Sequence, residues 1–434
     1  MGSHRMKGWI YCAARGATGR AASGPPAPKQ IRPPNMRTDM TSRERILSTV
    51  CGRDTDHVPL HIDVHPSYLS YDPTVAHWDD QFQRTDDLLT LGTDPMIEVW
   101  LPDPVAHPDV KITTWREDNT PDGVPRLGKA YETPKGTLRQ VIRETDDLYQ
   151  WHRINRNTRG PLADLIDGVG LLEDVNPSRS CAFLINGPED LDAMEYLFNP
   201  PQGDALSRWR RDADYAAQQA RERGVCLLAR RLYAGAALLW LTDATESICT
   251  FDEHPQYVQR FLDIIEQWQM KMLAMALDVG VDLVTRFGYY DTPDFWGVEH
   301  FDRFLKPLID REAHACEQAG AYLMQQQSKG VTQQRDVFRE MNVHVLRDLD
   351  PVQGEEDMAL LKRELGDTKT LMGGINCDML LANADREQVT QLVAETLDLM
   401  SPGGRFIMHL VPGVYAGVPW QKVLQLIDDW KHHA

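Results

Sequence analysis

The chain has 434 residues, a hydrophobic content of 42% and a formal net charge of −18. This length allows one large core, and the acidic balance argues against a broad phosphate-binding surface, because nucleic-acid affinity comes mainly from clustered Lys and Arg. No run approaches the roughly 20 apolar residues that cross a bilayer. We therefore expect a cytoplasmic protein with a small-molecule substrate and with neither a nucleic acid nor a membrane as its partner.

The first residues differ from the rest in composition. Residues 1–38 contain two lysines, five arginines, no acidic residue and a run of small residues and prolines. Two interpretations stay open, namely a start that is not part of the folded protein and an organelle transit peptide, which is also rich in arginine and poor in acidic residues. In both cases we predict a disordered leader over residues 1–40.

From Thr41 onward, short apolar segments alternate with longer amphipathic ones, a pattern typical of parallel strands joined by helices. Apolar residues in segments such as 255–277 recur at helical spacing, so we assign them to the core. Eight strand candidates can be counted, which is the number in a (β/α)8 or TIM barrel. We predict one α/β domain of this kind over residues 41–434. The candidate strands are residues 58–63, 95–100, 225–230, 281–287, 321–327, 343–349, 370–375 and 405–411.

One long interruption, about residues 102–201, follows the second strand. Alternating apolar and polar residues on both sides of Pro134-Lys135-Gly136 predict an inserted β-hairpin. An insertion after a barrel strand lies at the carboxyl ends of the strands, where barrel enzymes have their active sites. We therefore expect this hairpin region to form a lid over the pocket.

The cysteine and glycine patterns indicate which thiol state and which cofactors to expect. The seven cysteines form no CxxC pair, which favours reduced thiols in a cytosol. The sequence also contains no GxGxxG fingerprint, so no nucleotide cofactor is expected.

Four stretches look like a known superfamily. They are SRERILSTVCGRDTDHVPL near the start, YETPKGTLRQVIRET in the insertion, DPVQGEEDMALLKRELGDTKTLMGGIN, and the terminal LMSPGGRFIMHLVPGVYAGVPWQKVLQLIDDW. Together they resemble uroporphyrinogen decarboxylase-like proteins over roughly residues 41–431. The resemblance implies a (β/α)8 barrel, in agreement with the independent strand count, and an enzyme that is either a decarboxylase or a methyltransferase.

The site motifs of both branches are altered in this sequence. Where true decarboxylases have an RQAGR segment that binds substrate carboxylates, this chain reads HIDVHPSYLSYDP, and their GHG-like turn is replaced by Val411-Pro412-Gly413. The HxCG and PGCG motifs of the zinc methyltransferases are replaced by Gln325-Gln326-Gln327-Ser328 and by Pro402-Gly403-Gly404. The resemblance therefore implies a divergent branch, for which a methyltransferase role is expected by analogy.

Candidate metal ligands gather at strand ends. His61, Asp63 and His65 alternate along the first strand and its exit, so the period of two directs them to one face. His409 in the last strand neighbours the first strand when the barrel closes, and Cys377 follows the seventh strand. Because imidazole and thiolate groups suit zinc, His61, His65, Cys377 and His409 form a candidate zinc site. A buried histidine bonded to an aspartate, and an inert buried cysteine, remain the alternatives.

Catalytic and substrate-binding candidates lie at the ends of other strands. Asp63, together with Tyr290 and Asp291 after the fourth strand, could move protons. An arginine would hold a carboxylate or phosphate through its planar fork, and an Arg–Asp structural pair is the alternative for the fourth strand. The predicted substrate-binding residues are Arg230, Tyr233, Arg286, Gln325 and Lys329.

Three functions are compatible with this sequence. The first is a methyltransferase-like enzyme that acts on a small methylated substrate, with assistance from a metal, and passes the methyl to a thiol or to a corrinoid on a separate partner protein. The second is a decarboxylase of a carboxylated, uroporphyrinogen-like substrate. The third is a catalytically silent barrel that binds a small molecule. Exposed helices such as residues 420–430 favour a homodimer.

Overall fold

The computed structural model describes residues 39–434 except 66–67, 69–71, 146–178 and 234. Most of the predicted leader and the middle of the predicted insertion therefore lie outside the described residues.

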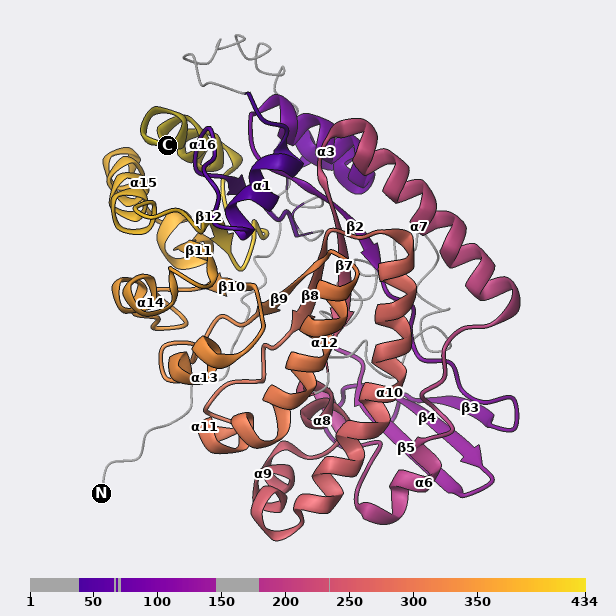
Figure 1. Ribbon diagram of the computed structural model, residues 1–434. Coiled ribbons are helices and arrows are strands. Elements are labelled where there is room, and N and C mark those ends of the chain that lie inside the picture. Colours follow the sequence, from indigo (N-terminus) through magenta and orange to yellow (C-terminus); the bar gives the residue numbers. More distant parts are fainter. Residues whose placement is uncertain (1–38, 66–67, 69–71, 146–178, 234) are drawn as a thin grey trace.

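Eight parallel strands form one sheet in the order β1-β12-β11-β10-β9-β8-β7-β2. The strands follow chain order and the last lies beside the first, which is the arrangement of a (β/α)8 barrel. Figure 1 shows the sheet curled, with helices on its outside. Each of the eight predicted segments overlaps one strand, although β7 and β11 extend one or two residues beyond the predicted ends. The strands are β1 (Leu60–His61), β2 (Met96–Trp100), β7 (Cys226–Leu232), β8 (Leu283–Phe287), β9 (Tyr322–Gln326), β10 (Val345–Leu349), β11 (Thr370–Asn376) and β12 (Phe406–Val411).

The helices connect successive strands and cover the sheet. The predicted helix at residues 255–277 is α10 (Pro255–Val279), and its apolar face is buried as the spacing indicates. No helix among the described residues is long and apolar enough to span a membrane. The others are α1 (Ser42–Val50), η1 (Pro73–Asp79), α3 (Gln81–Thr90), η4 (Pro188–Asp190), α6 (Leu191–Met194), α7 (Gly203–Arg223), α8 (Gly235–Leu241), α9 (Ala244–Glu253), α11 (Gly297–His300), η5 (Phe301–Leu305), α12 (Lys306–Gln318), α13 (Arg335–Glu340), α14 (Met358–Leu365), η6 (Cys377–Leu381), α15 (Arg386–Met400) and α16 (Trp420–His433).

The barrel interior is apolar at its amino-terminal end. Side chains from seven of the eight strands meet Ile46 and Val50 of α1 there in one buried cluster. Because alternate residues of a strand face the same side, this cluster also fixes which later residues of each strand face the interior. The strand members of the cluster are Met96, Cys226, Leu228, Leu283, Met324, Val345, Met372 and Ile407.

The insertion after β2 contains a second, antiparallel sheet with β4 and β5 as a hairpin. Figure 1 shows this sheet at the side of the barrel, beside α6. Whether it acts as a lid stays a prediction, because residues 146–178 of the same insertion are outside the described residues. Its strands are β3 (Lys111–Glu117), β4 (Arg126–Thr133), β5 (Gly136–Arg143) and β6 (Ser180–Ala182).

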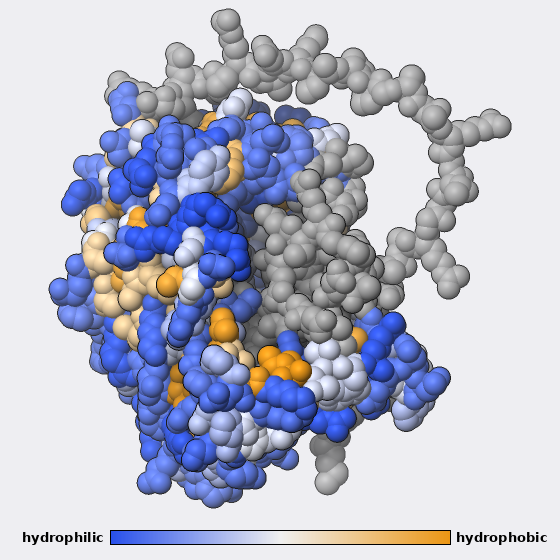
Figure 2. All heavy atoms as spheres, turned by 90° about the vertical axis from the view of Figure 1, so that its right-hand side faces the viewer, coloured by the Kyte–Doolittle hydropathy of each residue, from blue (hydrophilic) through white to orange (hydrophobic). Residues whose placement is uncertain are grey.

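The outer surface on the α7 side is mainly hydrophilic, with smaller apolar patches (Figure 2). A groove of about 940 Å³ lies between α7 and α10, and its walls include Trp209, Arg210 and Met275. Trp209 anchors α7 to the barrel, since its indole N–H donates to the carbonyl oxygen of Trp100 at 2.9 Å.

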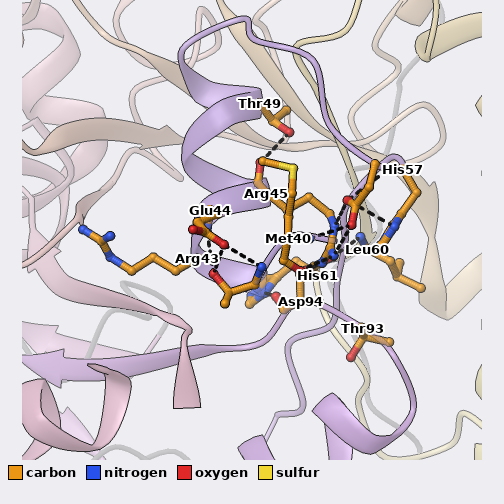
Figure 3. A network of polar contacts seen from close by, with 12 residues as sticks. Met40, Arg43, Glu44, Arg45, Thr49, His57, Leu60, His61, Thr93 and Asp94 are labelled. Atoms are coloured by element: carbon orange, nitrogen blue, oxygen red, sulfur yellow. Dashed lines mark hydrogen bonds and ion pairs between the residues drawn. The ribbon is translucent and has the colours of Figure 1, made fainter. Parts of the chain in front are cut away.

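Asp94 joins β1 to β2, the one neighbouring pair that shares no strand ladder among the described residues. Its backbone N–H donates to the Leu60 oxygen at 2.7 Å, and its carboxylate accepts from the Leu60 N–H at 3.1 Å. The other carboxylate oxygen binds Arg45 of α1 at 2.5 Å, and the same guanidinium holds Asp56 at 2.6 Å. Figure 3 shows these contacts converging at the base of the barrel. We call Arg45 and Asp94 the clasp.

The clasp should contribute strongly to stability. Asp94 is fully buried, so Asp94→Ala leaves the Arg45 guanidinium with one carboxylate partner in place of two. Breaking a buried ion pair on one side costs about 3 kcal/mol. We expect D94A to lower the free energy of unfolding by that amount in urea titrations. The exposed control Asp212→Ala should change it by less than about 0.5 kcal/mol, and equal effects of the two variants would contradict a clasp.

Candidate functional site

The barrel interior changes from apolar to polar toward the carboxyl ends of its strands. Two residues beyond the apolar cluster, six strands each place a polar side chain toward the interior, and β1 adds His61, whose register partner on β12 is His409. We call these seven residues the polar layer. They are His61, Glu98, Arg230, Thr285, Gln326, Arg347 and His409.

Asp63, which follows β1, is the central acceptor of this layer. Its Oδ1 accepts from His61 Nε2 at 2.9 Å. Its Oδ2 accepts from Arg347 of β10 and lies 3.4 Å from Nη2 of Arg230 of β7. Burial alone would raise the pKa of Asp63, but Arg347 and Arg230 outweigh it and hold that pKa well below its usual range. Asp63 is therefore an ionised carboxylate that ties together three strands.

His61 is held on both sides by acceptors. Its Nδ1 donates to the backbone oxygen of Asp94 at 2.8 Å, while Nε2 faces the Asp63 carboxylate. A carbonyl oxygen cannot donate, so both bonds form together only when the ring carries two protons. This geometry makes His61 a group that can release a proton beside Asp63.

His409 and Asp348 form a second histidine–carboxylate pair. His409 Nε2 lies 3.1 Å from Asp348 Oδ1, and Nδ1 donates to the His61 oxygen at 3.0 Å. Both side chains are fully buried. Burial lowers the pKa of His409, although Asp348 opposes this shift. Burial would raise the pKa of Asp348, but the His409 hydrogen bond and Arg347 lower it overall.

A bulge in β10 brings two consecutive side chains to the same site. Asp348 has a φ of 67°, in the left-handed region that few residues other than glycine adopt, and the register with β11 shifts between Arg347 and Leu349. In a regular strand, neighbours point to opposite faces. Here Arg347 reaches Asp63 while Asp348 reaches His409, and Arg347 Nε also contacts Asp348 Oδ1 at 3.3 Å.

Arg230 is positioned by an acid and by two rings. Its Nη1 donates to Glu98 Oε1 at 2.6 Å, and its guanidinium lies 5.6 Å from the ring centre of Trp100 and 5.7 Å from that of Phe287. Cation–π contacts of this kind favour a fixed, planar arginine. Arg230 is thus a preorganised cation at the rim of the polar layer.

The four predicted zinc ligands do not come together. His61 and His409 have ring centres 5.4 Å apart, but the ring nitrogens of both face protein acceptors. His65 stacks on Tyr415 at 4.0 Å, and Cys377 is fully buried in the main apolar core. Burial also raises the pKa of the Cys377 thiol. The described residues include no group of three His, Cys, Asp or Glu side chains arranged to hold a metal ion, so His61, His65, Cys377 and His409 do not fit the zinc site predicted from their residue types.

The predicted cluster around Arg286 lies outside the barrel interior, between the sheet and α12. Arg286 pairs with Asp291 and, at 3.1 Å, with Glu312 of α12. Gln325 joins the same group, 3.3 Å from Arg286. The structural Arg–Asp pair, which the sequence left open, is what the structure shows. Because residues alternate along a strand, Thr285 and Gln326 face the interior in place of Arg286 and Gln325.

The remaining predicted residues have structural partners. Tyr233 is buried against Trp240, with ring centres 4.8 Å apart, and Tyr290 lies in the same aromatic group, 6.1 Å from Trp240. Lys329 forms an exposed ion pair with Asp294 at 2.6 Å. The contacts of all three are therefore those of packing and surface pairing.

Sequence reasoning found Asp63, His61, His409 and Arg230 but missed Arg347 and its neighbours. Arg347 and Asp348 are a charged pair inside an otherwise apolar strand segment, and both are fully buried. Since charged residues are almost never fully buried without a partner, two charges within a predicted buried strand are the signal that identifies them.

The fold and the polar layer define a TIM-barrel-like α/β protein with its candidate site at the carboxyl ends of the strands. A family model described as uroporphyrinogen decarboxylase (URO-D) matches residues 240–433. This match agrees with the resemblance predicted from the sequence over that part of the chain, which carries Thr285, Gln326, Arg347, Asp348 and His409.

Solved structures with low sequence identity are similar to this chain, and the first of the two below supports the barrel fold. A methyltransferase from Methanosarcina mazei is similar at 13% identity, with a TM-score of 0.54, over 91% of this chain and 99% of the other. A B12-independent methionine synthase from Shewanella sp. W3-18-1, in complex with selenomethionine, has 11% identity and a TM-score of 0.35 over 54% of this chain and 66% of the other. No curated protein matches the chain.

The burial of Cys377 predicts an unreactive thiol. Thiolates, not thiols, react with disulfide reagents, and burial raises the pKa of Cys377. We expect Ellman's reagent to label the exposed Cys181 and Cys249 in the native protein, and Cys377 only after unfolding. Peptide mapping by mass spectrometry identifies the labelled residues, with Cys377→Ser as the control. Rapid labelling of native Cys377 would contradict this placement.

The Arg286 cluster predicts a pH-dependent stability. Burial raises the pKa of Glu312 from 4.5 to about 7, although Arg286 opposes the shift. Between pH 4.5 and about pH 7, Glu312 of the native protein holds a proton that the unfolded chain has released. The free energy of unfolding therefore falls as the pH rises through this window and stays constant above it.

Urea unfolding at pH 5 and pH 8 measures this effect. We expect a loss of roughly 2–3 kcal/mol between the two pH values from Glu312, and a flatter profile in Glu312→Gln. The exposed Glu299→Gln is the matched control and should leave the profile unchanged. A profile in E312Q as steep as that of the wild type would show that another group is responsible.

Proposed function

We propose that the chain is a methyltransferase-like enzyme that acts on a small methylated substrate in the polar layer. The methyl group passes to an external acceptor, either a thiol or a corrinoid carried by a separate protein. The observation that carries the proposal is the ring of contacts Asp63–His61–His409–Asp348–Arg347 at the carboxyl ends of β1, β10 and β12. The match of the URO-D family model to residues 240–433 supports it.

The ring supplies acid–base chemistry that suits this reaction. As the bond between the methyl carbon and the substrate heteroatom breaks, the electron pair stays on the heteroatom, and a new bond forms between the methyl carbon and the acceptor. The heteroatom then needs a proton to leave as a neutral group. His61 can supply that proton from Nε2, next to the Asp63 carboxylate, which is 19% exposed.

Asp63 has a second task in this proposal. Its Oδ1 contacts His61 Nε2 at 2.9 Å and so orients the ring that supplies the proton, and Arg347 and Arg230 hold the carboxylate in place. The proposal assigns no step to zinc, because the predicted ligands do not form a set among the described residues. It also assigns no residue to activation of the methyl acceptor.

Decarboxylation is the second candidate function. The convergence of Arg230 and Arg347 within reach of one Asp63 oxygen favours it, because paired arginines also bind substrate carboxylates. In that reaction carbon dioxide leaves and the substrate carbon takes a proton, so the two functions yield different products.

The full chain, tested with labelled substrates, separates the two. Methyl-labelled alcohols, amines and aromatic ethers would be incubated with 2-mercaptoethanesulfonate or free cob(I)alamin, and uroporphyrinogen would be tested for carbon dioxide release. We expect a methylated acceptor, and in Asp63→Asn a kcat lower by roughly 10²-fold. The exposed Asp212→Asn is the control, and thermal melting verifies that both variants fold.

Two outcomes would contradict the proposal. Carbon dioxide release without methyl transfer would favour the decarboxylase, and full methyl transfer by D63N would remove Asp63 from the reaction. His61→Gln provides an independent variant, which should also lower kcat because glutamine has no proton to release at Nε2.

A further inference from the structure

Within the part of the chain that the structure describes, four buried polar atoms of the polar layer have no hydrogen-bond partner. They come from four neighbouring strands, β7 to β10, so they lie along one side of the barrel interior. A buried donor or acceptor without a partner costs about 1–3 kcal/mol, and such atoms in a native protein commonly mark the place of a ligand or an ordered water. The four atoms are Arg230 Nε, Thr285 Oγ1, Gln326 Oε1 and Arg347 Nη1.

The orientation of Gln326 is fixed by its neighbour. Its amide nitrogen donates to Asp348 Oδ2 at 2.7 Å. Because the pKa of Asp348 is lowered, this carboxylate is ionised and can only accept. The amide oxygen must then face away from Asp348, because two oxygens would repel each other. Gln326 is 1% exposed, so bulk water does not reach its Oε1. A bound ligand would supply the missing donor.

Arg347 presents the complementary group beside it. Arg347 and Gln326 are register partners on β10 and β9, and Arg347 is fully buried. Its Nη2 and Nε are used by Asp63 and Asp348, which leaves Nη1 for an acceptor. Two register partners therefore supply an arginine N–H that lacks an acceptor and an amide oxygen that lacks a donor.

Arg230 adds a second cationic donor, and Thr285 adds a hydroxyl. Arg230 Nη1 and Nη2 face Glu98 and Asp63, so Nε is the free N–H. Thr285 is the register partner of Arg230 on β8, and its hydroxyl can donate or accept. Both arginines reach toward the same Asp63 oxygen, so an anionic group between them would be within reach of both.

The charges nearby also permit an anion. Three arginines, Arg84, Arg230 and Arg347, interact with the carboxylates of Asp63, Glu98 and Asp348. This set is balanced before either histidine is counted. An incoming acceptor therefore meets no excess of negative charge among these groups.

We propose that these four atoms form a subsite for a small carboxylic acid that carries a hydroxyl or amino group on the carbon next to the carboxyl carbon. The carboxylate accepts from Arg230 Nε and Arg347 Nη1, the hydroxyl or amino hydrogen donates to Gln326 Oε1, and Thr285 completes the shell. The inference rests on the proposed function for the place of reaction, and it names the substrate class of that same site.

Titration calorimetry with the full chain tests the subsite without turnover. The probes are glycolate, glycine, acetate and glycolamide, at millimolar concentration. We expect glycolate and glycine to bind about tenfold more tightly than acetate, since acetate leaves Gln326 Oε1 without a donor. Glycolamide has no negative charge and should not bind measurably.

Two variants link the binding to these residues. Gln326→Leu should abolish the preference for glycolate over acetate while it preserves acetate binding, and Arg347→Lys should weaken both acids about tenfold, because lysine lacks the planar fork. Gln218→Leu, on the exposed face of α7, is the matched control. Thermal melting identifies a variant that fails to fold, and Thr285→Val, which keeps the side-chain volume, replaces it in that case and should weaken glycolate binding.

The outcomes are distinct. Equal binding of glycolate, acetate and glycolamide, or a crystal soaked in glycolate with ordered water alone at the four atoms, would overturn the subsite. Selective glycolate binding in a chain that transfers no methyl group would refute only the proposed function. Methyl transfer from neutral substrates, without glycolate binding, would refute only the subsite.

Discussion

The Asp63 carboxylate is the constraint on which the rest of the site depends. A buried carboxylate is stable only when it is paired and hydrogen-bonded, and its partners here come from β1, β7 and β10. These strands are not neighbours in the sheet, so the contacts cross the barrel interior. Each partner must keep its place for Asp63 to stay ionised, and the polar layer is therefore held as one unit.

The eight strands could be predicted from the sequence because parallel strands under a helical layer are short, nearly continuous apolar runs. Because these strands are buried on both faces, their sequences do not reveal which residues point into the barrel. The sequence predicts Arg286 and Gln325 as site residues, whereas the interior positions are Thr285 and Gln326, one residue away in each strand. An antiparallel sheet with one face in water would have revealed this parity through alternation, but a buried parallel strand does not.

Two features of the site depend on backbone conformation and packing, and the sequence pattern does not predict them. The left-handed conformation of Asp348 turns a second consecutive side chain into the interior, and aspartate tolerates this region without being a glycine that would signal it. Cys377 shows the reverse case, since its position after β11 allowed it to face the pocket, and only the packing places its thiol in the apolar core.

Asp94 both closes the barrel and orients His61, the proton donor. Asp94 holds β1 to β2 through Leu60 and is held in turn by Arg45 of α1, while its backbone oxygen accepts from His61 Nδ1. Because that oxygen can only accept, it fixes a proton on Nδ1 and directs Nε2 toward Asp63. A shift of the clasp would therefore move the His61 ring and change the proton available at Asp63, although Arg45 lies at the opposite end of the barrel from the polar layer. Stability at the base and chemistry at the mouth are in this way coupled through the single peptide unit that follows Asp94.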